Sequence, residues 1–140
     1  FESVGHIGGR LLCDTVEKIG RGAVQAVPQQ GAASLAPPLT KAMAFMDFAC
    51  PANELHNLAR GCNPWPLAWF EHAGKRIKVT ATRLDSRNGP AGEVLSTQPL
   101  SIGCGTGALI LEHVVPEGSR PMTGEDWAMG KRFKAGDKLF

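Results

Sequence analysis

The sequence has few of the features that mark membrane, disulfide-rich or metal-binding proteins. No apolar run approaches the roughly 20 residues that a membrane-spanning helix needs, and the opening FESVGHIGGR lacks the charged-then-apolar order of a signal peptide. The four cysteines are widely spread without a C-x-x-C pair, which gives disulfide and zinc frameworks little support. We therefore expect a soluble protein that binds no metal and keeps buried or half-buried reduced thiols at Cys13, Cys50, Cys62 and Cys104.

The chain also has little net charge. A formal charge of +2 does not by itself imply a nucleic-acid partner. The second half is nevertheless more basic, because residues 75–140 hold ten Lys and Arg against seven Asp and Glu, whereas residues 1–74 hold five against six. With 140 residues, 43% of them hydrophobic, the chain can form one globular domain, alone or with attached pieces.

Three regions follow from the hydrophobic pattern. Apolar residues recur at helical spacing over residues 1–20, although Gly8 and Gly9 weaken the helix propensity. The following stretch, RGAVQAVPQQGAASLAPPLTKA, has no period and indicates an extended linker. From residue 44 onward, short β-like runs alternate with Gly and Pro, and TGEDWAMG indicates a late helix. This pattern predicts a mainly β protein, a small antiparallel barrel with one or two short helices, preceded by an N-terminal helix and an extended linker.

Six runs are expected to form the strands. Turns at HAGK and GTG would each join two of them as a hairpin. The runs are AFMDF (44–48), LAWFEH (67–72), RIKVTATRL (76–84), GEVLS (92–96), LSIGC (100–104) and ALILEHVV (108–115).

A helix ending at a proline-rich corner precedes the second run. In ELHNLARGCNPWP, the residues Leu55, Leu58, Ala59 and Cys62 form one apolar stripe, and Pro51 suits the first helical position. The prolines of NPWP cannot continue the helix, so an extended exit follows, with Trp65 expected as a large apolar anchor.

No catalytic or metal site is recognisable in the sequence. GCGTG (103–107) lies between two strands and lacks the spacing of a phosphate-binding loop, so a hairpin turn is expected there. The spacing of His56 from the cysteines does not put metal ligands on one face. Glu125 and Asp126 would point to different sides of a helix.

The basic residues give a better candidate. In a strand with period 2, Arg76 and Lys78 share one side with Thr80 and Thr82, and Lys75 and Arg83 stand at the two ends. Such a cationic rail would suit phosphates, and an ordinary solvated face is the open alternative. Further basic residues could extend the rail if the fold brings them to the same side: Arg60, Arg120, Lys131, Arg132 and Lys134.

Several motifs resemble the C-terminal region of methionyl-tRNA formyltransferases. ELHNLARGCNPWP matches the family signature E-L-x-x-x-x-R-x-x-N-P-W-P. APPLTKAMAFMDF matches the linker and first strand, and GKRIKVTATRL, the G-x-V-L segment, PEGSRPMTGEDWAMG and FKAGDKLF match the later blocks in order. The resemblance implies three parts: residues 1–22 as the last helix of a mostly absent Rossmann-like catalytic domain, 23–43 as linker, and 44–140 as an OB-like Greek-key barrel.

The resemblance also implies a function. Such enzymes transfer formyl from 10-formyltetrahydrofolate to initiator methionyl-tRNA in the cytoplasm, at translation initiation, and their catalytic residues belong to the missing domain. This chain would be inactive alone, bind no cofactor and help to hold the tRNA. By motif position Lys41 is the linker lysine, Arg60 the signature arginine and Arg120 the basic residue before the late Met. Four signature residues look architectural, with a contact to RNA as the open alternative: Asn63, Pro64, Trp65 and Pro66.

Two other functions remain open at this point. The same barrel could belong to a related folate-dependent formyltransferase or dehydrogenase, or it could be a free-standing OB-like nucleic-acid-binding module. The NPWP corner and the basic rail favour the tRNA enzyme over a related formyltransferase or dehydrogenase. The apolar helix at residues 1–20 argues against a free-standing nucleic-acid-binding module. A monomeric parent enzyme is expected, and the uncovered helix would allow the fragment to self-associate.

Overall fold

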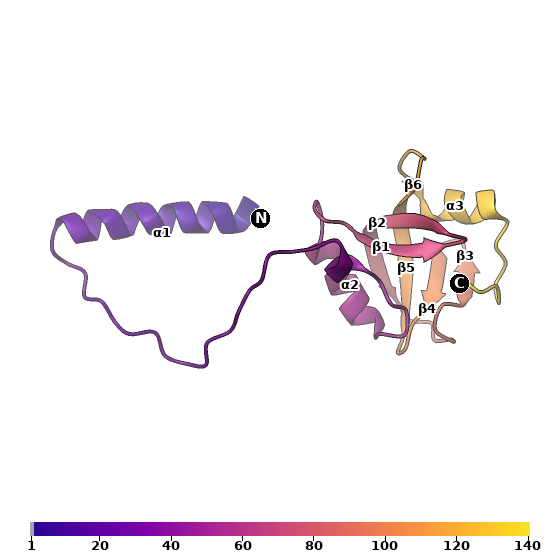
Figure 1. Cartoon of the computed structure of the whole chain (residues 1–140), viewed down its shortest axis with the longest axis horizontal. Coiled ribbons are helices and arrows are strands. Elements are labelled where there is room, and N and C mark those ends of the chain that lie inside the picture. The colour runs from indigo at the N-terminus through magenta and orange to yellow at the C-terminus, as the bar shows by residue number, and fades with distance from the viewer. Residues whose placement is uncertain (1) are drawn as a thin grey trace. The chain divides into compact units, whose positions relative to one another are not determined.

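The computed structural model describes residues 2–140 and divides into two compact units, with the boundary between Ala36 and Pro37. Figure 1 shows the first unit as a helix with a long extended tail, and the second as a sheet with short helices beside it. None of the helices in the described residues is both long enough and apolar enough to cross a membrane.

The first unit contains the long helix α1 (Glu2–Gly20), which confirms the helix expected from the sequence. It ends where Gly22 adopts a positive φ of 67° and the N–H of Ala23 bonds to the carbonyl of Lys18, a common way to close a helix. Residues 23–40 have no regular helix or strand. The apolar side chains of α1 stay 59–72% exposed: Val4, Ile7, Leu11, Leu12, Val16 and Ile19.

The second unit is a mainly antiparallel sheet, as predicted. Its strands lie in the order β1-β2-β5-β4-β3, and β6 also pairs with β5. No pairing among the described strands joins β1 to β3, so the barrel is open. The strands are β1 (Ala68–His72), β2 (Lys75–Asp85), β3 (Val94–Thr97), β4 (Leu100–Gly103), β5 (Ala108–Pro116) and β6 (Met122–Thr123).

The prediction of a strand at residues 44–48 is wrong. The first residue of this segment is the last residue of the short 3-10 helix η1 (Ala42–Ala44), and within the segment only Phe45 bridges to β1, at Trp69. The strand cannot continue because the Asp47 carboxylate accepts the N–H of Ala49 at 2.9 Å and turns the chain. The sixth strand is the two-residue β6 instead. The other five runs form strands as expected.

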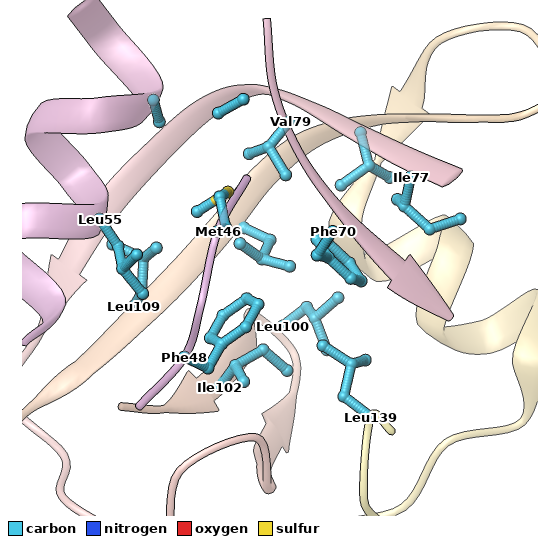
Figure 2. Packing of buried hydrophobic residues seen from close by; sticks show 14 of the residues in the cluster. Met46, Phe48, Leu55, Phe70, Ile77, Val79, Leu100, Ile102, Leu109 and Leu139 are labelled. Atoms are coloured by element: carbon cyan, nitrogen blue, oxygen red, sulfur yellow. The ribbon is translucent and has the colours of Figure 1, made fainter. Parts of the chain in front are cut away.

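The core lies between the sheet and the segment that crosses it at residues 44–48 (Figure 2). Met46 and Phe48 are fully buried even though they belong to no strand. The Phe48 and Phe70 rings meet edge to face at 5.5 Å, and Phe70 also meets Trp127 at 5.8 Å. Aliphatic side chains from β2, β4 and β5 complete this core, including Ile77, Val79, Leu100, Ile102 and Leu109.

Helix α2 (Ala52–Gly61) packs its stripe onto this core as predicted, with Leu55, Ala59 and Cys62 buried and Leu58 half-buried against them. Pro51 is the N-cap rather than the first helical residue, a difference of one position. Its carbonyl accepts the N–H of Leu55 at 3.2 Å, so it still starts the helix.

The corner after α2 differs from the expectation, because Trp65 is 57% exposed and is not an anchor in the core. Other groups fix the turn. The N–H of Leu67 bonds to the carbonyl of Cys62 at 2.9 Å, and the Asn63 side-chain amide donates to the carbonyl of Thr80 at 2.9 Å. Since these hydrogen bonds hold the backbone from α2 to β1, the Trp65 ring is not needed inside the core.

Both predicted hairpin turns are present. Between β1 and β2, Ala73 and Gly74 have positive φ values of 51° and 71°, which suits a two-residue hairpin. Between β4 and β5, the N–H of Gly105 bonds to the carbonyls of Phe48 and Cys50 at 2.9 and 3.0 Å. That N–H is therefore engaged within the protein, and the GCGTG turn is not a phosphate-binding loop.

The late helix α3 (Gly124–Lys131) confirms the last predicted element. Thr123 caps it by accepting the N–H of Asp126 at 3.1 Å. On its inner side Trp127 is buried and meets the rings of Phe70, His72 and Phe133 at 5.3–5.8 Å. The helix thereby covers the end of the core.

Candidate nucleic-acid interface

Strand β2 does not carry one continuous basic rail. Buried and exposed residues alternate from Arg76 to Val79, but the pairing with β5 shifts register between Val79 and Ala81 and again between Ala81 and Thr82. Such a bulge changes which side chains point to each face. The side that carries Arg76 and Lys78 therefore does not continue through Thr82 to Arg83.

The four basic residues predicted on this strand consequently fall on three surfaces. Arg76 and Lys78 lie together beside β1. Lys75 lies next to α3, in a hollow that it shares with His72 and Lys131. Arg83 lies beyond the bulge, where its guanidinium pairs with the Glu112 carboxylate at 3.2 Å. The predicted rail is thus wrong as a single surface, because neighbouring residues point to opposite faces and the bulge interrupts the period.

The Arg76 guanidinium is held over an aromatic ring. Its central carbon lies 4.0 Å from the Trp69 ring centre, which is the geometry of a cation–π contact. Phe45 meets the same ring edge to face at 5.0 Å, and the Trp69 indole N–H donates to the carbonyl of Lys41 at 2.7 Å. These contacts fix Trp69 and tie the start of the second unit to β1.

A groove forms where this cluster meets the proline-rich corner. We call it the Trp65 groove; it encloses about 290 Å³ and its walls bring three cationic side chains, Lys41, Arg76 and Lys78, close to two indoles. None of the residues that line it is acidic. The complete lining is Lys41, Pro64, Trp65, Pro66, Leu67, Trp69, Arg76 and Lys78.

The hollow on the other side of Arg76 has a mixed charge. It encloses about 550 Å³ and contains Glu71 and Glu117 as well as Arg76 and Lys78. A Glu117 carboxylate oxygen accepts the backbone N–H of Arg76 at 3.1 Å. Because two carboxylates oppose the two cations there, this larger hollow suits an anionic ligand less well than the Trp65 groove does.

The remaining candidate residues do not converge on the groove. The Arg60 guanidinium bonds to the Asn57 side chain at 3.1 Å and faces Thr80 and Thr82 across a separate hollow. Arg120 is exposed in the turn between β5 and β6. The last three stand at or just after the end of α3 and are exposed: Lys131, Arg132 and Lys134.

The part of the chain that the structure describes holds no cluster of metal ligands. Across residues 3–140 no three His, Cys, Asp or Glu side chains lie close enough to hold a metal ion. His56 bonds through Nδ1 to the Thr82 hydroxyl at 2.8 Å, and His72 through Nδ1 to the Leu139 carbonyl at 2.6 Å. Both histidines are thus engaged in hydrogen bonds within the protein.

Sequence reasoning missed the two tryptophans at this surface. The hydrophobic pattern places Trp65 in the core and indicates no more for Trp69 than a position in a strand. A usable signal existed, because Trp69 stands directly opposite Lys78 in the β1–β2 hairpin, whose register follows from a two-residue turn. The exposure of Trp65 had no such local signal, since it depends on how the corner meets β1 and Lys41.

The fold and the groove together define a small, open, mainly β domain with a basic, aromatic-lined surface. The chain belongs to the formyl transferase C-terminal domain family, whose model matches residues 38–132. This confirms the resemblance found in the sequence.

Curated relatives agree with this assignment. A methionyl-tRNA formyltransferase of Thermus thermophilus is 35% identical over 134 residues, covering 94% of this chain and 43% of the relative. The enzyme of the same name from Frankia alni is 37% identical over 139 residues, covering 94% and 42%. The chain therefore spans less than half the length of these relatives.

Solved structures of HypX from Aquifex aeolicus share the fold. One variant gives a TM-score of 0.62 at 18% identity, covering 91% of this chain and 23% of HypX. HypX has also been solved in complex with tetrahydrofolic acid, and that structure gives a TM-score of 0.60. At this identity the likeness shows the fold alone.

Proposed function

We propose that this chain is the C-terminal, tRNA-holding part of a cytoplasmic methionyl-tRNA formyltransferase. The parent enzyme would transfer formyl from 10-formyltetrahydrofolate to initiator methionyl-tRNA. The family match over residues 38–132 and the relatives' names support this proposal. The groups that bind folate and transfer protons would belong to the part that the relatives have and this chain lacks, so the 140 residues should show no formyl transfer above a control without protein.

The division of the chain forms part of the same proposal. Residues 1–22 would be the last helix of the catalytic domain, residues 23–43 the linker and residues 44–140 the tRNA-binding domain. The uncovered apolar stripe of α1 supports this division, since side chains such as Leu11 are spaced to pack on a partner. In the isolated chain the same stripe could pair with a second copy.

The observation that carries the tRNA-holding role is the Trp65 groove, with three cations and no carboxylate in its lining. Lysine and arginine side chains bind nucleic acid by contacting phosphates and releasing counterions. We therefore assign the main contact to Lys41, Arg76 and Lys78. The other predicted residues are secondary contacts, because they stand on separate surfaces: Arg60, Lys75, Arg83, Arg120, Lys131, Arg132 and Lys134.

A salt series tests this assignment. Binding of initiator tRNA to the chain is measured by fluorescence anisotropy, for the wild type and for the double variant Arg76→Ala/Lys78→Ala. We expect the variant to bind about tenfold more weakly near physiological salt and to lose roughly 1.5 units of the logarithmic salt slope, two phosphates' worth. Discrimination between initiator and elongator tRNA should scarcely change, because phosphate contacts carry little sequence information.

The matched control removes two charges from a different surface. Arg10→Ala/Lys18→Ala changes the net charge by the same amount on α1 and should retain the affinity and the slope. Thermal unfolding of the Arg76→Ala/Lys78→Ala variant checks that its fold is intact. Equal slopes for both double variants and the wild type would show that the β1–β2 surface does not hold tRNA.

A further inference from the structure

The ring of Trp65 is held in place but left open to solvent. Its backbone lies within the corner fixed by the Leu67–Cys62 hydrogen bond, and prolines flank it on both sides. Even so, the side chain is 57% exposed. An indole with a fixed backbone and a free surface can stack on a ligand with little loss of conformational freedom.

Trp69, the other indole of the groove, is already occupied by the protein. Arg76 stacks over it at 4.0 Å, and Phe45 meets it at 5.0 Å. Its N–H is also engaged, by the carbonyl of Lys41. A ligand ring entering the groove would therefore stack on Trp65, whereas Trp69 would serve to position Arg76.

The charge around Trp65 identifies the chemistry of the ligand. Lys41, Arg76 and Lys78 line the same groove, and none of its lining residues is acidic. Cations beside an exposed aromatic ring are the combination by which proteins bind single-stranded nucleic acids, with phosphates on the charges and bases on the ring. In a duplex the bases are stacked on one another, so their faces are not free for an indole.

We propose that Trp65 stacks on an unpaired base of the RNA whose phosphates meet Lys41, Arg76 and Lys78. The Trp65 groove would then hold a single-stranded or looped segment of the RNA rather than a helical stem. This inference rests on the proposed RNA-holding function and adds to it the class of RNA structure that the groove accepts.

The test compares two RNAs on three forms of the chain. The RNAs are a short oligouridylate and a blunt-ended, fully paired RNA duplex with the same number of phosphates, and binding is followed by anisotropy at fixed salt. The forms are the wild type, Trp65→Leu and Trp65→Phe. We expect Trp65→Leu to weaken oligouridylate binding about tenfold, because stacking on an aromatic ring is lost. Duplex binding should be unchanged, and Trp65→Phe should retain most of the oligouridylate affinity.

Indole emission gives an independent readout. Trp127 is buried and Trp69 is covered by Arg76, so quenching by bound oligouridylate should come mainly from Trp65. Quenching should therefore be strong in the wild type and nearly absent in Trp65→Phe. Met129→Ala, at another exposed apolar residue (66%), is the control and should bind both RNAs like the wild type.

The outcomes separate this inference from the proposed function. If Trp65→Leu binds oligouridylate as tightly as the wild type while Arg76→Ala/Lys78→Ala loses affinity, the stacking is overturned and the RNA-holding function stands. Equal weakening toward both RNAs also overturns the stacking. If the double variant loses no affinity for any RNA, the RNA-holding function fails as well.

Discussion

Helices α1 and α2 both place apolar side chains three and four residues apart, yet only α2 has them buried. In α2, Leu55 and Ala59 are 3% and 1% exposed, whereas in α1 Leu11 and Val16 are 65% and 59% exposed. Alpha-helical periodicity therefore indicates which face needs a partner, and the rest of the chain decides whether one exists. For α2 the partner is the sheet of its own unit. Within its own unit, α1 has only an extended tail.

The largest expected effect comes from truncating a core ring and comparing it with a truncation on α1. Phe70 is 1% exposed and touches two aromatic rings, so Phe70→Ala should lower the free energy of unfolding by about 3–5 kcal/mol. Leu11→Ala should change it by less than about 0.5 kcal/mol, because the side chain is exposed. Urea unfolding followed by tryptophan fluorescence measures both. A comparable loss in the two variants would show that the stripe of α1 is packed in the isolated chain.

Cysteine reactivity sharpens the same comparison. Burial, and then the neighbouring Cys50 thiol, raise the pKa of Cys104 to about 11, although a hydrogen bond from the Leu109 backbone lowers it in part. Burial also raises the pKa of Cys62. Cys13 is exposed on α1, so the expectation of a buried or half-buried thiol is wrong there, because the helix face that carries it packs on nothing within the described part of its own unit. Because the thiolate is the reactive form, we expect labelling of native Cys104 at pH 8 to be at least about a hundredfold slower than labelling in denaturant.

The raised pKa of Cys104 also determines how the free energy of unfolding changes with pH. The folded state favours the neutral Cys104 thiol. Its contribution to the free energy of unfolding is therefore fully present below the pKa of the thiol in the unfolded chain, about 8.5, and is lost as the pH rises toward about 11.

Cys13 should label at nearly the same rate in native and denatured chain. Mass spectrometry of alkylated peptides separates the sites, and rapid labelling of native Cys104 would contradict its burial in the core.

The smallest effects should come from two glycine substitutions of opposite sign. A Cβ on Gly105 would overlap the carbonyl oxygen of Ala49, so Gly105→Ala should destabilise the second unit by about 1–3 kcal/mol. A Cβ on Gly8 in α1 would meet no atom within 4 Å, and Gly8→Ala should favour that helix by up to about 1 kcal/mol. Circular dichroism should show more helix and an unchanged melting temperature for Gly8→Ala. A Gly105→Ala protein as stable as the wild type would mean that the turn can move away from residues 48–50.

Much of the fold was predictable because it depends on neighbours in the sequence. The stripe of α2, the two hairpin turns and the alternation of Arg76, Ile77, Lys78 and Val79 require only periods of 3.6 and 2 and the conformations that glycine allows. The segment at 44–48 was not predictable in this way. Its composition suits a strand, but the turn made by Asp47 stops it, and its buried side chains are held by the sheet around them.

For the candidate site, the sequence by itself determined which residues are available: a basic second half, the lysine before AMAFMDF and the NPWP corner that carries the resemblance to the family. Only the tertiary structure decided which of them meet. The bulge in β2 separates Arg83 from Arg76, and the long-range bonds Asn63–Thr80 and Trp69–Lys41 bring the corner, the linker lysine and β1 around one groove. Register shifts and contacts between residues 17 and 28 positions apart depend on the packing of the whole sheet, which no local period encodes.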